Sequence, residues 1–124
     1  VIIMRFSILV CDDSTVARKQ VIRCLKECID ADIQQATNGK DALEQLRQRH
    51  FDLLCLDLTM PEVDGIEVLE QIKISKIESY VLVISADIQQ KMQARVAQLG
   101  AIDFIHKPIN KTQLSAVLHK FGIY

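Results

Sequence analysis

The sequence predicts an α/β fold: a doubly wound parallel sheet of five strands with five flanking helices. Two observations predict it. Short apolar runs alternate along the chain with segments whose apolar residues recur at helical spacing. The 124 residues also contain no linker, internal repeat or low-complexity stretch. Because strands that alternate with helices are joined by right-handed crossovers, we expect one sheet covered on both faces, and a single domain over residues 1–124.

Five apolar runs are the expected strands. The first, residues 6–11, is a buried run that stops at Asp12 and Asp13. The others cover residues 33–36, 51–56, 81–84 and 104–106. The run at 33–36 is less apolar than the first, so we expect that strand near the edge of the sheet.

The expected helices follow the strands one by one. Ser14, Asn38 and Asn110 are placed to begin the first, second and fifth helices, and Gly100 is placed to end the fourth. The apolar faces of the five helices are, in chain order, Ala17, Val21, Leu25 and Cys28; Ala42, Leu43 and Leu46; Val68, Leu69 and Ile72; Ile88, Met92, Val96 and Leu99; and Leu114, Val117, Leu118 and Phe121.

Composition narrows the possible partners and the compartment. Lys and Arg number 15 against 16 for Asp and Glu, so the charge gives no general reason to bind nucleic acid or an anionic membrane. The apolar runs are too short to span a membrane, and the apolar start at residues 1–4 has no basic segment before it that would indicate a signal peptide. We therefore expect a cytoplasmic protein with four free thiols. The alternative, a metal pair at Cys24 and Cys28, lacks further ligands nearby.

Polar residues follow the expected strands at the points where they end. Asp12 and Asp13 close the first strand, Asp57 the third, Ser85 the fourth and Lys107 the fifth. In such sheets, ligands bind outside the carboxyl ends of the strands. Three carboxylates in one crevice repel each other, so Lys107 and a hard divalent cation are needed to offset them. Since the set contains no His or Cys, Mg²⁺ or Mn²⁺ is favoured over zinc.

This set of residues is suited to phosphoryl transfer. Asp57 stands alone on a central strand, as a nucleophile that forms an aspartyl phosphate should. The adjacent Asp12 and Asp13 are suited to a metal, while Lys107 and Ser85 can contact phosphate oxygens. The simpler alternative, that each acid only caps a helix or turns the chain, does not explain why all these residues gather at one edge.

The same motifs resemble the receiver domain of two-component response regulators. The resemblance is carried by Leu9-Val10-Cys11-Asp12-Asp13-Ser14, Asp57-Leu58-Thr59-Met60-Pro61-Glu62-Val63-Asp64-Gly65, Ser85-Ala86 and Lys107-Pro108. It covers nearly the whole chain, and the motifs are specific because they occur together and in order. It implies a flavodoxin-like fold with strand order 2-1-3-4-5.

The resemblance also implies a role for each residue at the acidic end of the sheet. Asp57 is expected to be the phosphoacceptor. Asp13, Asp57 and the carbonyl of Thr59 are expected to bind Mg²⁺ directly, and Asp12 mainly through bound water.

The remaining motif residues are expected to form the switch. Lys107 would pair with the phosphate, and Ser85 would supply the hydroxyl that moves to meet it. Phe104 falls at the aromatic switch position, although it could equally be a core residue. The bond between Lys107 and Pro108 is usually cis in this family, which X-Pro bonds accommodate at modest cost.

The implied function is that of a chemotaxis-type receiver, or of a receiver taken from a longer regulator. It would accept a phosphoryl group from a histidine kinase or phosphotransfer domain and catalyse only its own phosphorylation and dephosphorylation. It would signal to a downstream protein through the surface of the fourth helix, fifth strand and fifth helix, with no nucleic acid or membrane bound. Two alternatives stay open. A haloacid-dehalogenase-type phosphatase would need an Asp-x-Asp motif, whereas Asp12 and Asp13 are adjacent; a pseudo-receiver would lack site residues.

Overall fold

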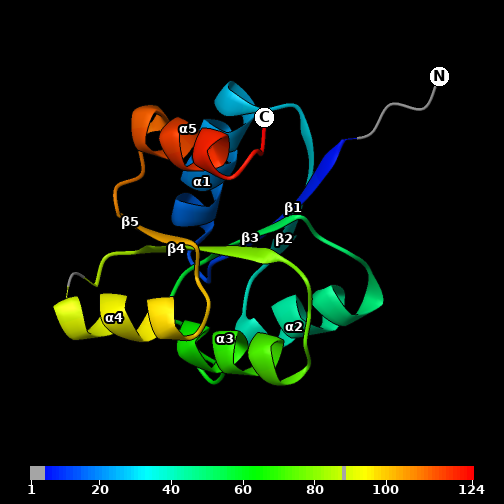
Figure 1. The fold of residues 1–124 in the computed structure, drawn as a ribbon, viewed down its shortest axis with the longest axis vertical. Coiled ribbons are helices and arrows are strands. Elements are labelled where there is room, and N and C mark those ends of the chain that lie inside the picture. Colours follow the sequence, from blue (N-terminus) through cyan, green and yellow to red (C-terminus); the bar gives the residue numbers. More distant parts are fainter. Residues whose placement is uncertain (1–4, 88) are drawn as a thin grey trace.

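The parallel sheet and its strand order are confirmed. The computed structural model describes residues 5–87 and 89–124, and in these ranges it contains one five-stranded parallel sheet of order β2-β1-β3-β4-β5 (Figure 1). The expectations for the apolar start at 1–4 and for Ile88 lie outside these residues. No helix in the described ranges is long and apolar enough to cross a membrane.

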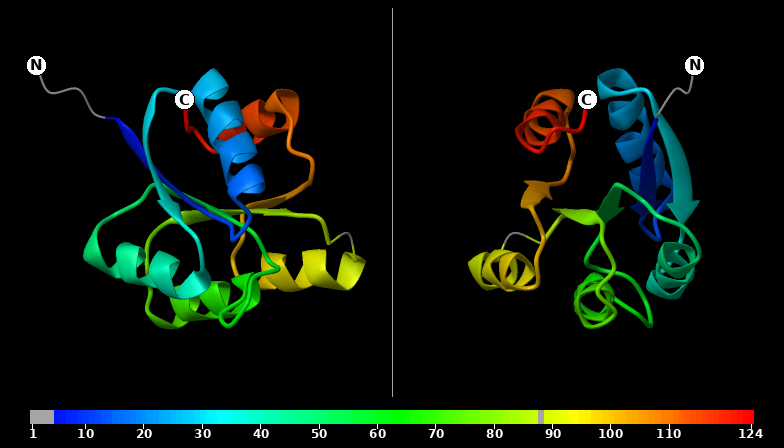
Figure 2. Two further views of the ribbon diagram at one scale, coloured as in Figure 1. Left: turned by 180° about the vertical axis from the view of Figure 1, so that it is seen from behind. Right: turned by 45° about the vertical axis from the view of Figure 1, so that its right-hand side comes forward.

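The strands are β1 (Phe6–Cys11), β2 (Ala31–Ala36), β3 (Leu53–Leu56), β4 (Tyr80–Ser85) and β5 (Asp103–His106). The helices are α1 (Thr15–Cys28), α2 (Gly39–Gln48), α3 (Gly65–Ile74), α4 (Gln90–Gln98) and α5 (Lys111–Lys120). Helices α1 and α5 cover one face of the sheet, and α2, α3 and α4 cover the other (Figures 1 and 2).

Alternation along the central strands divides the core between the two faces. Leu53 and Cys55 of β3 pack in the cluster beneath α1 and α5, whereas Leu54 and Leu56 pack in the cluster beneath the other helices. A strand buried on both faces must be apolar at every position, as β3 is. Strand β2, which carries exposed glutamines, pairs only with β1 and forms the expected edge.

The predicted helix ends agree with the structure. The side chains of Ser14, Asn38 and Asn110 each accept a hydrogen bond from a backbone N–H in the first turn of α1, α2 and α5. Gly100 follows α4 with a φ of 100°, a conformation that favours glycine.

Several strand boundaries differ from the prediction: β2 begins two residues earlier, β4 and β5 begin one residue earlier, and β4 ends one residue later. Strand β3 begins at Leu53 and not at residue 51. Phe51 is buried and was therefore included in the predicted third strand. At Asp52, however, the side-chain carboxylate accepts a hydrogen bond from the Ser7 backbone N–H at 2.7 Å, and regular strand β3 begins only at the next residue. Burial of Phe51 was visible in the sequence; this side-chain contact with β1 was not.

Gly65 closes the loop that follows β3, and its size matters there. Its N–H donates to the Leu58 carbonyl at 3.0 Å. A Cβ at this position would lie 2.5 Å from the Asp57 carbonyl oxygen and 2.7 Å from the Leu58 Cα. Both are backbone atoms, so a larger residue can be accommodated only if the loop moves.

We expect Gly65→Ala to lower the free energy of unfolding by about 2 kcal/mol, measured by urea denaturation, because the overpacked loop must shift. Gly122→Ala is the control: at φ 76° it strains the backbone, but nothing lies within 4 Å of its Cβ. Only Gly65→Ala should also weaken divalent-ion binding beside Asp57. Equal metal affinity in the two variants would show that the loop tolerates the added methyl group.

Candidate acidic phosphoacceptor site

The predicted site residues meet at the carboxyl edge of the sheet. Asp12 directly follows β1 and Asp57 directly follows β3, and these two strands are neighbours. Ser85 ends β4, and Lys107 follows β5. Asp12 and Asp57 are buried, with 3% and 5% of their surface exposed, whereas Asp13 is exposed.

Lys107 bridges the two buried carboxylates. Its Nζ donates to Asp12 Oδ2 at 2.8 Å and to Asp57 Oδ1 at 3.3 Å. The Lys107 backbone N–H donates to the Ser85 carbonyl at 2.9 Å, which ties the ends of β4 and β5 together. One ammonium therefore faces two buried carboxylates, and the exposed Asp13 adds a third negative charge.

The three aspartates can hold a hard cation. One carboxylate oxygen from each of Asp12, Asp13 and Asp57 lies within 4.8 Å of the others. Carboxylate oxygens are the ligands that Mg²⁺ prefers, and the exposed side of Asp13 leaves room for the waters that Mg²⁺ keeps. The acidic cluster therefore fits the predicted ion in donor type, spacing and accessibility.

The pKa values of Asp57 and Lys107 reflect the excess of negative charge at the site. Burial and the neighbouring Asp12 carboxylate raise the pKa of Asp57, and they outweigh the opposing effects of Lys107 and of a hydrogen bond with the Thr59 backbone. Burial by itself would lower the pKa of Lys107, but its hydrogen bond to Asp12 and the charge of Asp57 raise it overall. The carboxylates are thus only partly neutralised by the protein.

The two proposed switch residues have their own contacts at this end of the sheet. Ser85 is buried, and its Oγ accepts a hydrogen bond from the Asp87 N–H at 3.1 Å; within the described ranges no hydrogen bond joins that hydroxyl to the carboxylates. Phe104 is half-buried against the core and meets the exposed His106 ring edge-on at 6.3 Å between centroids. The peptide bond between Lys107 and Pro108 is cis, as the resemblance implied.

Sequence reasoning missed one residue beside the site. Arg18 of α1 is buried and donates from Nη1 to the Asp12 carbonyl oxygen at 2.8 Å. A signal was present, since Arg18 falls on the same face of α1 as the buried Val21 and Leu25. The four cysteines are free thiols, as predicted.

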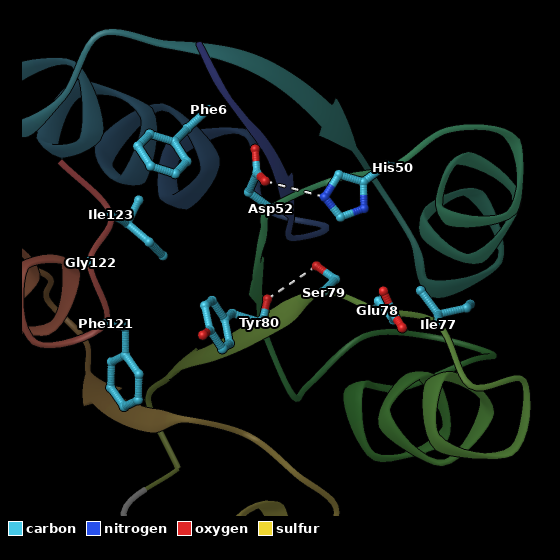
Figure 3. Close-up of a pocket in the computed structure, with 10 residues that line it drawn as sticks. All are labelled: Phe6, His50, Asp52, Ile77, Glu78, Ser79, Tyr80, Phe121, Gly122 and Ile123. Atoms are coloured by element: carbon cyan, nitrogen blue, oxygen red, sulfur yellow. Dashed lines mark hydrogen bonds and ion pairs between the residues drawn. The ribbon is translucent and has the colours of Figure 1, made fainter. Parts of the chain in front are cut away.

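A pocket at the other end of the strands, where they begin, is lined by none of the predicted site residues. It has a volume of about 420 Å³, and Phe6, Tyr80 and Phe121 form much of its apolar wall (Figure 3). Asp52 and Glu78 lie on its other side. The pocket lies where the strands begin, so it is separate from the acidic cluster.

Known proteins share this fold and these motifs. Residues 8–119 match the sequence profile of the response regulator receiver domain. Chemotaxis protein CheY of Bacillus subtilis (strain 168) is 33% identical over 117 residues, which are 94% of this chain and 98% of that protein. Transcriptional regulatory protein ZraR of Escherichia coli O157:H7 is 34% identical over 113 residues, which are 91% of this chain but 25% of that protein.

A solved structure shows the same architecture. A chain in the crystal structure of the CheX–CheY–BeF3–Mg²⁺ complex from Borrelia burgdorferi superposes with a TM-score of 0.86 at 26% identity, covering 96% of this chain and 90% of that one. The family match decides against the haloacid-dehalogenase alternative. The chain belongs to the response regulator receiver domains of two-component signalling.

Proposed function

We propose that this receiver accepts a phosphoryl group on Asp57 in a reaction that depends on Mg²⁺. The observation that carries the proposal is the cluster of the Asp12, Asp13 and Asp57 carboxylates, two of which share one ammonium, that of Lys107. The site holds more negative charge than Lys107 can offset, and a divalent cation supplies the difference. When bound, Mg²⁺ would also neutralise charge on the phosphate oxygens.

Asp57 is the best placed of the three aspartates to be the nucleophile. A carboxylate oxygen of Asp57 attacks the phosphorus, and the bond from phosphorus to the nitrogen of a phosphohistidine, or to the carboxyl oxygen of acetyl phosphate, breaks. The leaving group keeps the electron pair. Lys107 already contacts Asp57, so its ammonium lies where the new phosphate charge develops. Asp12 is held by Lys107 and by the Ser14 N–H, which leaves it to bind and orient.

The proposed donor and output follow from the family. The donor is a histidine kinase or phosphotransfer domain in the cytoplasm, and the receiver catalyses only its own phosphorylation and dephosphorylation. The output surface is that of α4, β5 and α5, recognised by a downstream protein. The relatives include both a protein of similar length and a longer one, so the chain supports either a chemotaxis-type regulator or a receiver joined to an output domain.

Acetyl phosphate with Mg²⁺ should add one acid-stable, base-labile phosphoryl group to the protein, as measured by intact mass. Asp57→Asn should take up none, whereas Asp52→Asn, at the other end of β3, should be labelled like the wild type. Label at wild-type level in Asp57→Asn would rule out the acceptor. Absence of label in the wild type, with and without Mg²⁺, would favour the pseudo-receiver alternative.

The proposed switch couples Ser85 to Phe104. If a bound phosphate draws in the Ser85 hydroxyl, the movement vacates space that the Phe104 ring can enter from its half-buried position. Phe104 has no hydroxyl that would need a buried partner, so the inward position requires no new hydrogen bond.

Beryllofluoride, which mimics the phosphoryl group, should shift amide NMR signals of β5 and α5 as well as those of the site loops. Phe104→Leu should keep the shifts near Asp57 and lose those in α5. Changes confined to the loops at Asp12, Asp57 and Ser85 in the wild type would contradict this route to the surface.

A further inference from the structure

Arg18 binds the backbone of the acidic loop, the segment between β1 and α1 that contains Asp12 and Asp13. Its guanidinium donates to the Asp12 carbonyl oxygen from Nη1 at 2.8 Å, to Gln35 Oε1 from Nε at 3.0 Å and to Thr15 Oγ1 from Nη2 at 3.4 Å. The side chain is buried, although a guanidinium is rarely buried unless its donors are satisfied. In the described part of the chain it forms no ion pair with a carboxylate.

These bonds join three elements at the residue that begins the site. Gln35 belongs to β2, and Thr15 begins α1. The Asp12 carbonyl belongs to the peptide bond that joins the buried Asp12 to the exposed Asp13. The Asp12 backbone N–H is held separately by the Ala36 carbonyl at 3.2 Å. Both polar backbone groups of Asp12 are therefore fixed, one by β2 and the other by Arg18.

Among the described residues, no hydrogen bond or ion pair joins Arg18 to a carboxylate oxygen of Asp12, Asp13 or Asp57. The oxygens of Asp12 are instead contacted by Lys107 Nζ at 2.8 Å and by the Ser14 N–H at 2.9 Å. Arg18 acts on the backbone that carries those side chains. Groups that orient metal ligands from behind affect binding strongly even though they do not touch the ion.

We propose that Arg18 is a positioning residue for the acidic loop: by fixing the Asp12 carbonyl it sets the orientation in which Asp12 and Asp13 meet a divalent cation. The inference rests on the proposed function, because it assumes that these aspartates bind the cation. It assigns an indirect effect on metal affinity, exerted through the Asp12 backbone, to a residue outside the acidic cluster.

Charge and position predict opposite results at Arg18, which makes the proposal testable. If Arg18 contributed only its positive charge, Arg18→Gln would tighten Mg²⁺ binding, because a like charge near the cation would be gone. If Arg18 positions the loop, Arg18→Gln weakens Mg²⁺ binding by roughly tenfold. Arg18→Lys keeps the charge but not the three-directional donor set, so it too weakens binding if positioning dominates.

The test measures Mg²⁺ dissociation constants by NMR titration of the full chain, together with amide exchange at Ser14 in the metal-free protein. Faster exchange at Ser14 in both Arg18 variants is expected, since the bond from Ser14 to Asp12 Oδ1 depends on the loop conformation. Arg23→Gln removes an exposed charge from the same helix, and Leu25→Val reduces the packing of the same helix at a buried position farther along it. Both controls should keep the wild-type affinity and exchange.

A variant that does not fold cannot decide the matter, so Gln35→Ala provides a milder test. It removes the acceptor of Arg18 Nε from an exposed position and leaves Arg18 in place, and it should weaken Mg²⁺ binding two- to threefold, roughly. Wild-type affinity in Gln35→Ala and in Arg18→Lys, or tighter binding in Arg18→Gln, would overturn the proposal. Failure of the wild type to bind Mg²⁺ at all would instead overturn the proposed function.

Discussion

Lys107→Met should destabilise the metal-free protein by about 3 kcal/mol, because it leaves two buried carboxylates without their shared cation. Asp12 and Asp57 lie close enough for Lys107 to contact both, and no other ammonium or guanidinium within the described ranges forms an ion pair with either. The loss should appear in urea unfolding at neutral pH.

Mg²⁺ should reverse part of this loss. Lys107 and the cation are drawn to the same carboxylates, so removing the ammonium should tighten Mg²⁺ binding while slowing phosphorylation, for which Lys107 faces the developing charge. Lys91→Met, on the exposed face of α4, is the matched control and should change none of these quantities. If Lys107→Met unfolds at the wild-type urea concentration and binds Mg²⁺ no more tightly, then Lys107 does not neutralise the site.

Asp57→Asn should have the opposite effect and stabilise the metal-free protein by about 1 kcal/mol, because it removes one of two neighbouring buried charges while Lys107 keeps Asp12 as its partner. Burial and Asp12 raise the pKa of Asp57 in the folded protein above its value in the unfolded chain, so the folded state binds the proton more tightly. The ionised carboxylate therefore costs stability at neutral pH. As the pH falls through the folded pKa, Asp57 becomes protonated in the folded protein and this cost begins to shrink; it is gone below the pKa of the unfolded chain.

The advantage of Asp57→Asn should accordingly shrink when the pH is lowered and when Mg²⁺ is added, since both treatments offset the Asp57 charge in the wild type. Thermal unfolding across pH, with and without Mg²⁺, measures this directly. Asp52→Ala removes the acceptor of the Ser7 N–H at the opposite end of the strands, so it should destabilise the protein, independently of Mg²⁺. A stabilisation by Asp57→Asn that ignores both pH and metal would contradict the electrostatic explanation.

The sequence was most informative about the elements themselves. Apolar runs such as 6–11 and helix caps such as Ser14 and Asn38 are local features, and the structure confirms them. The order of strands was different in kind, because periodicity identifies strands without saying which are neighbours. That order came from the resemblance to a known family, and the sheet pairing confirms it.

The sequence predicted which residues gather at the candidate site, but only part of how their side chains are arranged. Acids placed at strand ends had to meet in a parallel sheet, so Asp12 and Asp57 could be expected together. The sequence could not show that Lys107 lies nearer Asp12 than Asp57, because this depends on side-chain packing. Arg18 was missed for the same reason: its function lies in a bond to a backbone carbonyl, and a carbonyl is present at every residue.

Chemical trapping of the phosphorylated residue identifies the acceptor in the chain itself. After phosphorylation by acetyl phosphate with Mg²⁺, borohydride reduces an aspartyl phosphate to homoserine, and peptide mass spectrometry locates the change. We expect homoserine at position 57 alone, and none when Mg²⁺ is withheld. Homoserine at Asp12 or Asp13, or a labelled protein with no homoserine at any aspartate, would contradict this expectation.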